Sequence, residues 1–195
     1  MTYDIKSVFY LDTELTIPTG SAADKSDTVQ LDLSAFIDPI ARGRQMGTGL
    51  AIYKVHYSIS GNSEGFKPVG KTQEGIFRCG LIAGAGLGTQ VSADLSGTAN
   101  SVTANNALAV MGFDYYGPES MGTTAANASV PGPSNVTFLE PSKEVPYIVV
   151  RDNVCAVSTI SQALTTTSYV SFRLECAQVK LDQATLNQLL RTQTV

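Results

Sequence analysis

The chain has 195 residues, of which 43% are hydrophobic and 15% are charged, and its formal net charge is -4 at pH 7. The charged fraction lies well below the roughly 25% of an ordinary soluble domain, so we expect either a neutral, hydroxyl-rich exterior or large surfaces that other subunits cover. The 13 lysines and arginines are scattered, with no run denser than Arg42 and Arg44, which argues against the basic arm or patch of a protein that binds nucleic acid directly.

The length predicts a single domain over residues 1–195, because about 150 residues per domain is usual and all-β sandwiches often exceed it. Cys79, Cys155 and Cys176 are odd in number and form no CxxC pair, so we expect small buried hydrophobic side chains rather than a disulfide framework or a zinc site. Residues 1–17 lack the pattern of a signal peptide. No run of about 18 apolar residues predicts a membrane-spanning helix.

Alternation of apolar and polar residues predicts about eight strands separated by turn clusters. The predicted strands cover residues 7–17, 27–37, 50–60, 75–83, 106–116, 145–150, 154–160 and 168–181. In the third of these, the expected buried face carries Ala51, Tyr53, Val55, Tyr57 and Ile59, and the opposite face carries Lys54, His56 and Ser58. In the last, Val170, Phe172, Leu174 and Cys176 alternate with Ser171, Arg173 and Glu175.

Two further segments stand out from this pattern. Residues 117–141 contain four prolines among glycine, threonine, alanine and asparagine, and a surface loop of that length is usually functional, disordered or ordered by a partner. Residues 182–193 predict a helix that starts at the N-cap Asp182 and carries Leu186, Leu189 and Leu190 on one stripe. A helix of about three turns is too short to be stable alone, so it must pack on the sandwich or on a neighbour.

A glycine-rich stretch follows the fourth predicted strand, with Gly80, Gly84, Gly86 and Gly88 within nine residues. A dinucleotide-binding turn needs glycines at spacing two and then three, before a helix. The third position after Gly84 and Gly86 is Thr89, and no amphipathic helix follows. The stretch is therefore interpreted as a strand end that runs into a glycine hinge.

The sequence offers few candidates for catalysis or metal binding. His56 is the one histidine, and on a predicted strand face it is typical of a surface or interface residue rather than an acid-base catalyst. Asp12 and Glu14 share a strand face without any neighbour that would separate their pKa values. Asp24, Asp27 and the Asp152-Asn153 turn are oxygen donors but lack the dense spacing of a calcium loop. We expect no catalytic residues, no metal and no cofactor.

The successive segments 28–44, 49–60 and 169–181, followed by the helical residues 182–193, resemble small single jelly-roll major capsid proteins of icosahedral viruses of archaea and bacteria. The resemblance lies in a short N-terminal arm and first strand over residues 1–26, about eight strands, a very long loop over residues 117–141 and a closing strand with a short helix.

This resemblance implies an all-β single jelly-roll sandwich of two facing four-stranded antiparallel sheets, with a short C-terminal helix. It implies a non-enzymatic subunit that assembles with copies of itself into a virion shell, in the host cytoplasm, with a second capsid or vertex protein as a further candidate partner. Residues 1–20 contain one basic residue, Lys6, unlike the basic arms of many capsid proteins. The genome would then be separated from the shell by an internal membrane or another protein, or a different subunit would supply the charge.

For the contacts between subunits we select Leu186, Leu189 and Leu190 of the tail and the long loop over residues 117–141, together with Tyr115 and Tyr116 beside that loop. Two other classes of function remain open. A viral spike or fibre domain, or a lectin-like sandwich, would bind glycans around Tyr115 and Tyr116, and an enzyme on a β-sandwich would have to rely on His56.

Overall fold

The computed structural model describes residues 8–18, 26–38, 46–61, 76–84, 102, 107–116, 134–160 and 167–193. Within these ranges the chain forms nine strands and one helix. They are β1 (Phe9–Ile17), β2 (Ser26–Asp32), β3 (Met46–Gly61), β4 (Ile76–Ala83), β5 (Ala109–Tyr116), β6 (Ser134–Leu139), β7 (Tyr147–Val149), β8 (Asn153–Ile160), β9 (Ser168–Asp182) and α1 (Gln183–Thr192). No helix among the described residues is long and apolar enough to cross a membrane.

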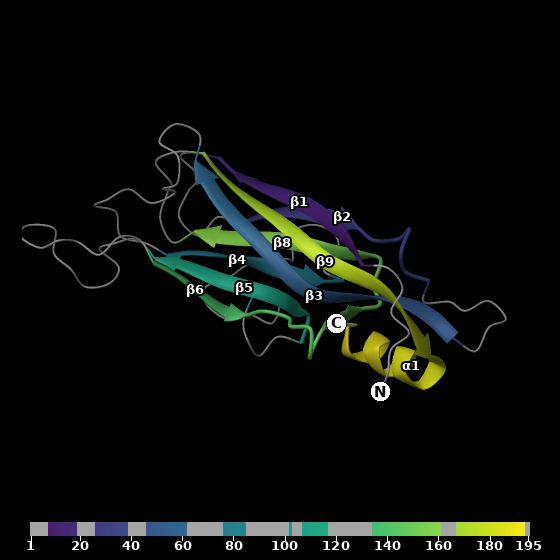
Figure 1. Cartoon of the computed structure of the whole chain (residues 1–195). Helices are drawn as coiled ribbons and strands as arrows, with labels where there is room; N and C mark the ends of the chain where they lie inside the picture. Colours follow the sequence, from purple (N-terminus) through teal and green to yellow (C-terminus); the bar gives the residue numbers. More distant parts are fainter. Residues whose placement is uncertain are drawn as a thin grey trace, which may run out of the picture.

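The strands form two antiparallel sheets that face each other (Figure 1). Sheet A has the order β1-β9-β3-β7, and sheet B has the order β2-β8-β4-β5-β6. If β6 is set aside, the first strand pairs with the last, the second with the second last, the third with β7, and β4 with β5. This nesting is a long hairpin of eight strands folded over on itself, which is the jelly roll. The predicted all-β jelly roll with a C-terminal helix is confirmed.

The fifth strand of sheet B corrects two expectations. The predicted surface loop over residues 117–141 contains β6, which pairs with β5, and sheet B therefore has five strands where the resemblance implied four. Valine, threonine and phenylalanine at 136–138 favour a strand. The flanking prolines Pro133 and Pro141 concealed this short run, because proline clusters are typical of loops.

Strand ends also differ from the predicted boundaries. The strand predicted over residues 27–37 ends at Asp32, where a turn begins: Ser34 N–H donates to Asp32 Oδ1 at 2.8 Å, and Phe36 N–H donates to the Leu33 carbonyl at 2.9 Å. Leu33 is nevertheless fully buried. Apolar alternation continued through this turn because Leu33 and Ile37 both point into the core, so periodicity alone did not reveal where hydrogen bonding to a neighbouring strand stops.

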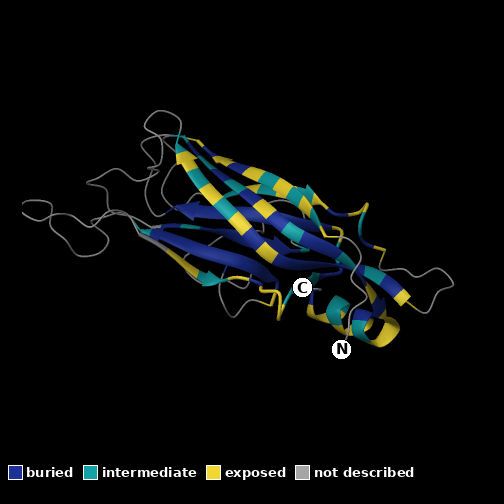
Figure 2. Cartoon of the chain, in the orientation of Figure 1, coloured by how far each residue is buried: buried dark blue, intermediate teal, exposed yellow. Residues whose placement is uncertain are grey.

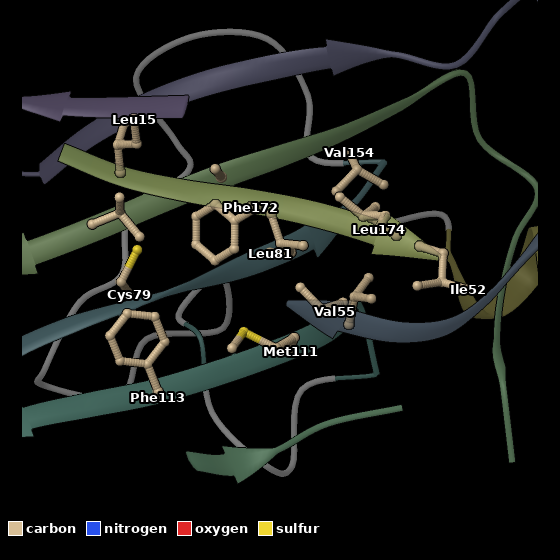
Figure 3. Packing of buried hydrophobic residues seen from close by; sticks show 14 of the residues in the cluster. Leu15, Ile52, Val55, Cys79, Leu81, Met111, Phe113, Val154, Phe172 and Leu174 are labelled. Atoms are coloured by element: carbon tan, nitrogen blue, oxygen red, sulfur yellow. The ribbon is translucent and has the colours of Figure 1, made fainter. Parts of the chain in front are cut away.

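The core fills the space between the inner faces of the two sheets (Figure 3). Phe172 and Leu174 of β9 lie opposite Leu81 of β4 and Met111 and Phe113 of β5, and all of these side chains are buried. The ring of Phe113 also stacks on Tyr57, with the ring centroids 4.2 Å apart. Packing of this kind between apolar inner faces is the main stabilising contribution of a sandwich.

The three cysteines are free and buried, as predicted. Cys79 and Cys176 belong to the core between the sheets, and Cys155 packs on the outer side of sheet B. Burial raises the pKa of all three thiols, that of Cys176 to about 12. A thiol that stays protonated at neutral pH is a poor nucleophile, so these cysteines act as small hydrophobic side chains.

The face assignment predicted for β3 is wrong at its first half, because the strand contains a β-bulge. The register with β9 shifts between Ile52 and Lys54, which leaves Tyr53 as the extra residue. Val55 faces the core together with Ile52, whereas Ala51 and Tyr53 face the opposite side of sheet A. A bulge of one residue inverts the alternation beyond it, and regular alternation cannot anticipate that inversion.

The outer face of sheet A has two parts, which Figure 2 shows by burial. Near α1, outward side chains of β3 and β9 are apolar and buried under the helix, with Leu186 fully buried among them. We call this part the helix-covered half; it comprises Ala51, Tyr53, Ala177, Val179, Leu181 and Leu186. The predicted N-cap is confirmed, because Asp182 Oδ1 accepts the Thr185 N–H at 2.7 Å. The helix packs on its own sandwich.

The outer face of sheet B explains one glycine of the glycine-rich stretch. Gly80 of β4 and Gly112 of β5 are cross-strand partners, and a Cβ atom at either position would lie 2.5 Å from Cγ1 of Val102. Val102 is fully buried against Ile82, Cys155 and Val157. The paired glycines therefore form a slot on the outer face of sheet B that receives the Val102 side chain.

Gly84 has a different role at the end of β4. Its φ of +61° lies in the left-handed region, where glycine is the favoured residue. The predicted strand end near Ala83 is confirmed. The glycine hinge stays a prediction, since Gly86 and Gly88 lie outside the described residues.

Candidate functional surface

The rest of the outer face of sheet A is polar and carries a surface depression. We call this part the polar half; its outward side chains are Tyr10, Asp12, Glu14, Lys54, His56, Ser58, Ser171, Arg173 and Glu175, all exposed or half-buried. A shallow groove of about 630 Å³ lies over it. Its lining comes from three adjacent strands: Asp12, Thr13, Glu14, His56, Tyr57, Ser58, Ser171, Phe172 and Arg173.

Strand register assembles this groove from residues far apart in the sequence. Arg173 of β9 is the cross-strand partner of Asp12 in β1 and of His56 in β3. One row further along, Ser171 is the partner of Glu14 and of Ser58. Side chains directly opposite each other on one sheet face lie about 4.5–5.5 Å apart at Cβ. The small Ser171 side chain on the central strand leaves the depression between these two rows.

The strongest contact in the groove joins Asp12 and Arg173. Arg173 Nε donates to Asp12 Oδ1 at 2.7 Å, and its Nη2 donates to Oδ2 at 3.3 Å. This hydrogen bond holds the pKa of Asp12 below its usual value and raises that of Arg173. The guanidinium also lies 5.9 Å from the ring centroid of Tyr10. Both charged side chains are largely exposed, at 60% and 58%, so water screens the pair strongly.

The histidine of the groove is not arranged as a catalytic base. His56 Nε2 lies 3.9 Å from Glu175 Oε2, which is longer than a hydrogen bond, so the carboxylate does not orient the imidazole as the acid of a catalytic triad does. The hydroxyl of Ser171 donates to Glu14 Oε2 at 2.8 Å rather than to the imidazole of His56. The groove therefore offers a ligand exposed hydrogen-bonding groups, some of them positively charged and some negatively charged.

A second polar cluster, which sequence reasoning missed, lies on the outer face of sheet B. Arg78 and Asp114 are cross-strand partners joined by two hydrogen bonds, Nε to Oδ1 at 2.6 Å and Nη2 to Oδ2 at 2.8 Å. Tyr116 Oη donates to the same Oδ2 at 3.3 Å, and the ring of Phe138 lies 5.3 Å from the guanidinium.

This cluster is mostly buried, with the side chains of Arg78 and Asp114 exposed by 20% and 8%. The hydrogen bond to Asp114 raises the pKa of Arg78, and burial, together with the Asp114 charge, raises that of Tyr116. Both groups thus keep their ordinary protonation at neutral pH, and the pair is a structural link between β4, β5 and β6. Only the strand register, which the sequence does not display, brings Arg78 to Asp114.

Comparisons with known proteins give structural matches alone. No protein-family model matches the chain, and no curated protein sequence matches it. Among solved structures, the chain is similar to VP1 of human polyomavirus 12 in complex with 3'-sialyllactosamine, with a TM-score of 0.41, 9% identity and coverage of 91% of this chain and 100% of that one.

Two further matches are viral VP1 proteins as well. Merkel cell polyomavirus VP1 in complex with disialyllactose gives a TM-score of 0.41 at 10% identity, and covers 90% of this chain and 96% of its own. The VP1 pentamer of human polyomavirus 7 gives 0.39 at 11% identity, with the same coverage of 90% and 96%. The jelly roll is established by the strand order, and TM-scores this low add nothing about function.

The residues selected for subunit contacts lie in two places. Leu186 is fully buried between α1 and the sheet, and Leu189 and Leu190 are half-buried beside it. Tyr115 is 8% exposed and faces the core, and Tyr116 is half-buried in the Arg78 cluster. Of the five, Leu189, Leu190 and Tyr116 retain surface that another molecule can reach.

Of the oxygen donors considered for calcium, those that the structure describes lie apart. On the β2–β8 pair, Asp27 lies opposite Ser158, whereas Asn153 lies opposite Asp32. Asn153 and Ser158 are five positions apart, which corresponds to about 17 Å along the strand at about 3.4 Å per residue. Asp24 falls outside the described residues. Within the described ranges, no three His, Cys, Asp or Glu side chains are grouped as metal ligands.

Proposed function

We propose that the chain is a viral structural protein, a single-domain capsid subunit that self-assembles into an icosahedral shell and resides in the virion. The observation that supports this most directly is the nested strand pairing of a jelly roll, β1 with β9, β2 with β8, β3 with β7 and β4 with β5. The wedge of two packed sheets that results is a scaffold from which subunits tile a closed surface.

The surface chemistry supports the same proposal. Charged residues make up 15% of the chain, and on the polar half the acidic side chain of Asp12 is paired with Arg173 of the same subunit. A surface with few unpaired charges loses little hydration free energy when it packs against another copy. In a closed lattice each interface can stay modest, because every subunit makes many contacts at once.

We assign the contacts between subunits to the accessible surface of Leu189, Leu190 and Tyr116, and to residues 117–133, for which the sequence predicts a loop. Contact with the genome would fall to a second capsid or vertex protein, or to an internal membrane beneath the shell, since basic residues are sparse along the whole chain.

Size-exclusion chromatography with negative-stain electron microscopy of the full chain tests the proposal. We expect uniform closed particles, under assembly conditions scanned over salt, pH and calcium. A chain that remains a monomer or a small oligomer throughout that scan would contradict it.

The contact residues need their own variant, because truncation at Asp182 would also remove the fully buried Leu186 and unfold the helix-covered half. A double substitution of Leu189→Ser and Leu190→Ser is milder. We expect it to abolish particles while leaving the circular dichroism spectrum unchanged. Thr185→Ser and Asn187→Ser on the same helix form a matched control that should assemble normally.

A second candidate function rests on the groove of the polar half. Its carboxylates, guanidinium, imidazole and hydroxyls are hydrogen-bonding groups of the kind that hold sugar hydroxyls, and the ring of Tyr10 lies beside them. A lectin-like or spike module would use this groove rather than the buried Tyr115. A glycan array with the wild-type protein, Arg173→Ala and the exposed helix variant Arg191→Ala tests it: binding that Arg173→Ala alone removes supports this candidate, and no binding contradicts it.

A further inference from the structure

Gln193, the residue that follows α1, uses every polar group it has. Its backbone N–H donates to the Leu189 carbonyl at 2.9 Å, which closes the end of the helix. Its backbone carbonyl accepts from Arg151 Nε at 2.9 Å. In the side chain, Oε1 accepts the Val150 N–H at 3.2 Å and Nε2 donates to the Ile148 carbonyl at 2.7 Å. The residue is 4% exposed.

The two side-chain bonds fall on the free edge of sheet A. Among the described strands, β7 is the last of that sheet, and β3 is its one neighbour there. Successive residues of a strand direct their N–H and C=O groups to alternate sides. Val149 lies opposite Leu50, with its carbonyl close to Gly49 of β3, so the Ile148 carbonyl and the Val150 N–H point away from β3. There they meet the primary amide of Gln193.

A primary amide with one donor and one acceptor on this edge reproduces what a neighbouring strand would supply. Exposed strand edges are templates for pairing with other chains, and native proteins block them. Here the block is a side chain, and α1 holds it in place.

Arg151 and Gly84 fix the position of Gln193 from the other sheet. A Cβ atom at Gly84 would lie 2.5 Å from Cγ of Arg151. The aliphatic part of the Arg151 side chain can therefore lie there only because residue 84 has no side chain. The Gly84 N–H donates to the Asn153 carbonyl at 3.0 Å. The guanidinium then reaches the end of α1, where a cation is favoured by the helix dipole. The glycine turn after β4 thus contributes to holding the C-terminal segment on β7.

We propose that Gln193 is an edge cap: the end of α1 closes the β7 edge of sheet A from within the chain, and its release opens that edge to strand pairing with a second copy. The inference is independent of the capsid proposal, because it concerns one chain in its folded state.

Hydrogen exchange at the Val150 amide in the full chain tests the cap. In Gln193→Ala the Val150 N–H loses its acceptor and the Ile148 carbonyl loses its donor, so we expect exchange at Val150 to accelerate at least about tenfold. Gln183→Ala is the matched control, since Gln183 lies at the exposed start of the same helix and its side chain donates to Asn187, away from β7. Equal exchange at Val150 in both variants would overturn the proposal.

Gln193→Glu separates the cap from general damage to the helix. An ionised carboxylate cannot donate to the Ile148 carbonyl, and repulsion between the two oxygens moves it away from the Val150 N–H, whereas a protonated carboxyl group donates and accepts as glutamine does. Protection of Val150 relative to wild type should therefore be low at pH 7 and recover as the pH falls toward about 4. A ratio that does not change with pH would also overturn the proposal.

Sedimentation velocity measures the consequence for association, in a buffer in which the wild-type chain does not assemble. We expect Gln193→Ala to associate more with rising concentration and to bind thioflavin T, while Gln183→Ala stays like the wild type. If the two alanine variants associate equally, the edge is not what Gln193 protects. Failure of the capsid proposal would instead appear in the wild type, as an absence of particles with normal protection of Val150.

Discussion

The polar half and the helix-covered half of sheet A lie on one sheet face and share the strands β3 and β9, yet their side chains differ in kind. On β9, the outward residues Ser171, Arg173 and Glu175 are followed, in unbroken alternation, by Ala177, Val179 and Leu181. The first group meets solvent and the second meets α1. The chemistry of an outward position is therefore set by what covers it rather than by its place in the alternation.

The inward side of β9 changes in the opposite sense. Val170, Phe172, Leu174 and Cys176 are buried in the core, whereas beyond them Gln178 donates to the Phe36 carbonyl at 2.9 Å and Lys180 is exposed. The strand runs past the end of the core, so its apolar side switches from one face to the other. Such an inversion within one strand shows where a sandwich ends and where another element covers the outer face.

Leu186→Ala should cause the largest loss of stability, and it should exceed the loss caused by a substitution in the polar half. Leu186 is fully buried in the helix-covered half, and removal of a buried leucine side chain costs about 2–5 kcal/mol. Tyr10→Ala, in the polar half and 58% exposed, should cost less than about 1 kcal/mol. Urea denaturation of both variants measures the two values. Similar losses of stability would mean that the division into halves has no energetic basis.

Gly47→Ala sharpens the description of the helix-covered half. A Cβ atom there would lie 2.8 Å from Cδ2 of Leu186, so overpacking should destabilise the protein by about 1–3 kcal/mol. In a Leu186→Ala background the added methyl group enters the cavity instead. We expect a favourable coupling of about 1 kcal/mol or more in the double-mutant cycle. Additive losses would show that the two sites do not touch.

The N-cap of α1 gives the helix-covered half a pH dependence. The Thr185 N–H holds the pKa of Asp182 below its ordinary value of 3.8. The carboxylate therefore stabilises the folded state above that value, and this contribution is lost as the pH falls through the lowered pKa. An asparagine in place of Asp182 would still cap the helix but would not titrate. The free energy of unfolding of wild type minus that of Asp182→Asn should be positive at pH 7 and shrink at acidic pH; a difference that is constant with pH would contradict this role.

Substitutions in the polar half should have the smallest effect on stability. Asp12→Asn and Arg173→Ala each break an ion pair that is exposed on both sides, and such pairs contribute little to stability. We expect the Tm to change by no more than about 2 °C, with any difference disappearing at high salt. A larger shift in calorimetry would mean that the groove is part of the stabilising framework.

Several elements were predicted correctly because they depend on neighbours in sequence. The closing strand 168–181, the cap at Asp182 and the leucine stripe of α1 are patterns of period two or 3.6, and each lies within one element. Burial of Cys79, Cys155 and Cys176 was also predicted, since a thiol without a partner pattern is usually a small hydrophobic group. The short strand β6 was missed because the prolines on either side of it, Pro133 and Pro141, dominated the local pattern.

The sequence by itself determined the alternation of the strands, the capped helix and the low charge of the surface, because these follow from residue types and their spacing along the chain. Only the tertiary structure decided that Asp12 pairs with Arg173, 161 residues away. It also decided that a bulge at Tyr53 inverts which side chains of β3 face the core, and that Gln193 caps the edge of β7. Each of these depends on register between distant strands. Register is set by how the whole hairpin folds over on itself, and no local pattern records it.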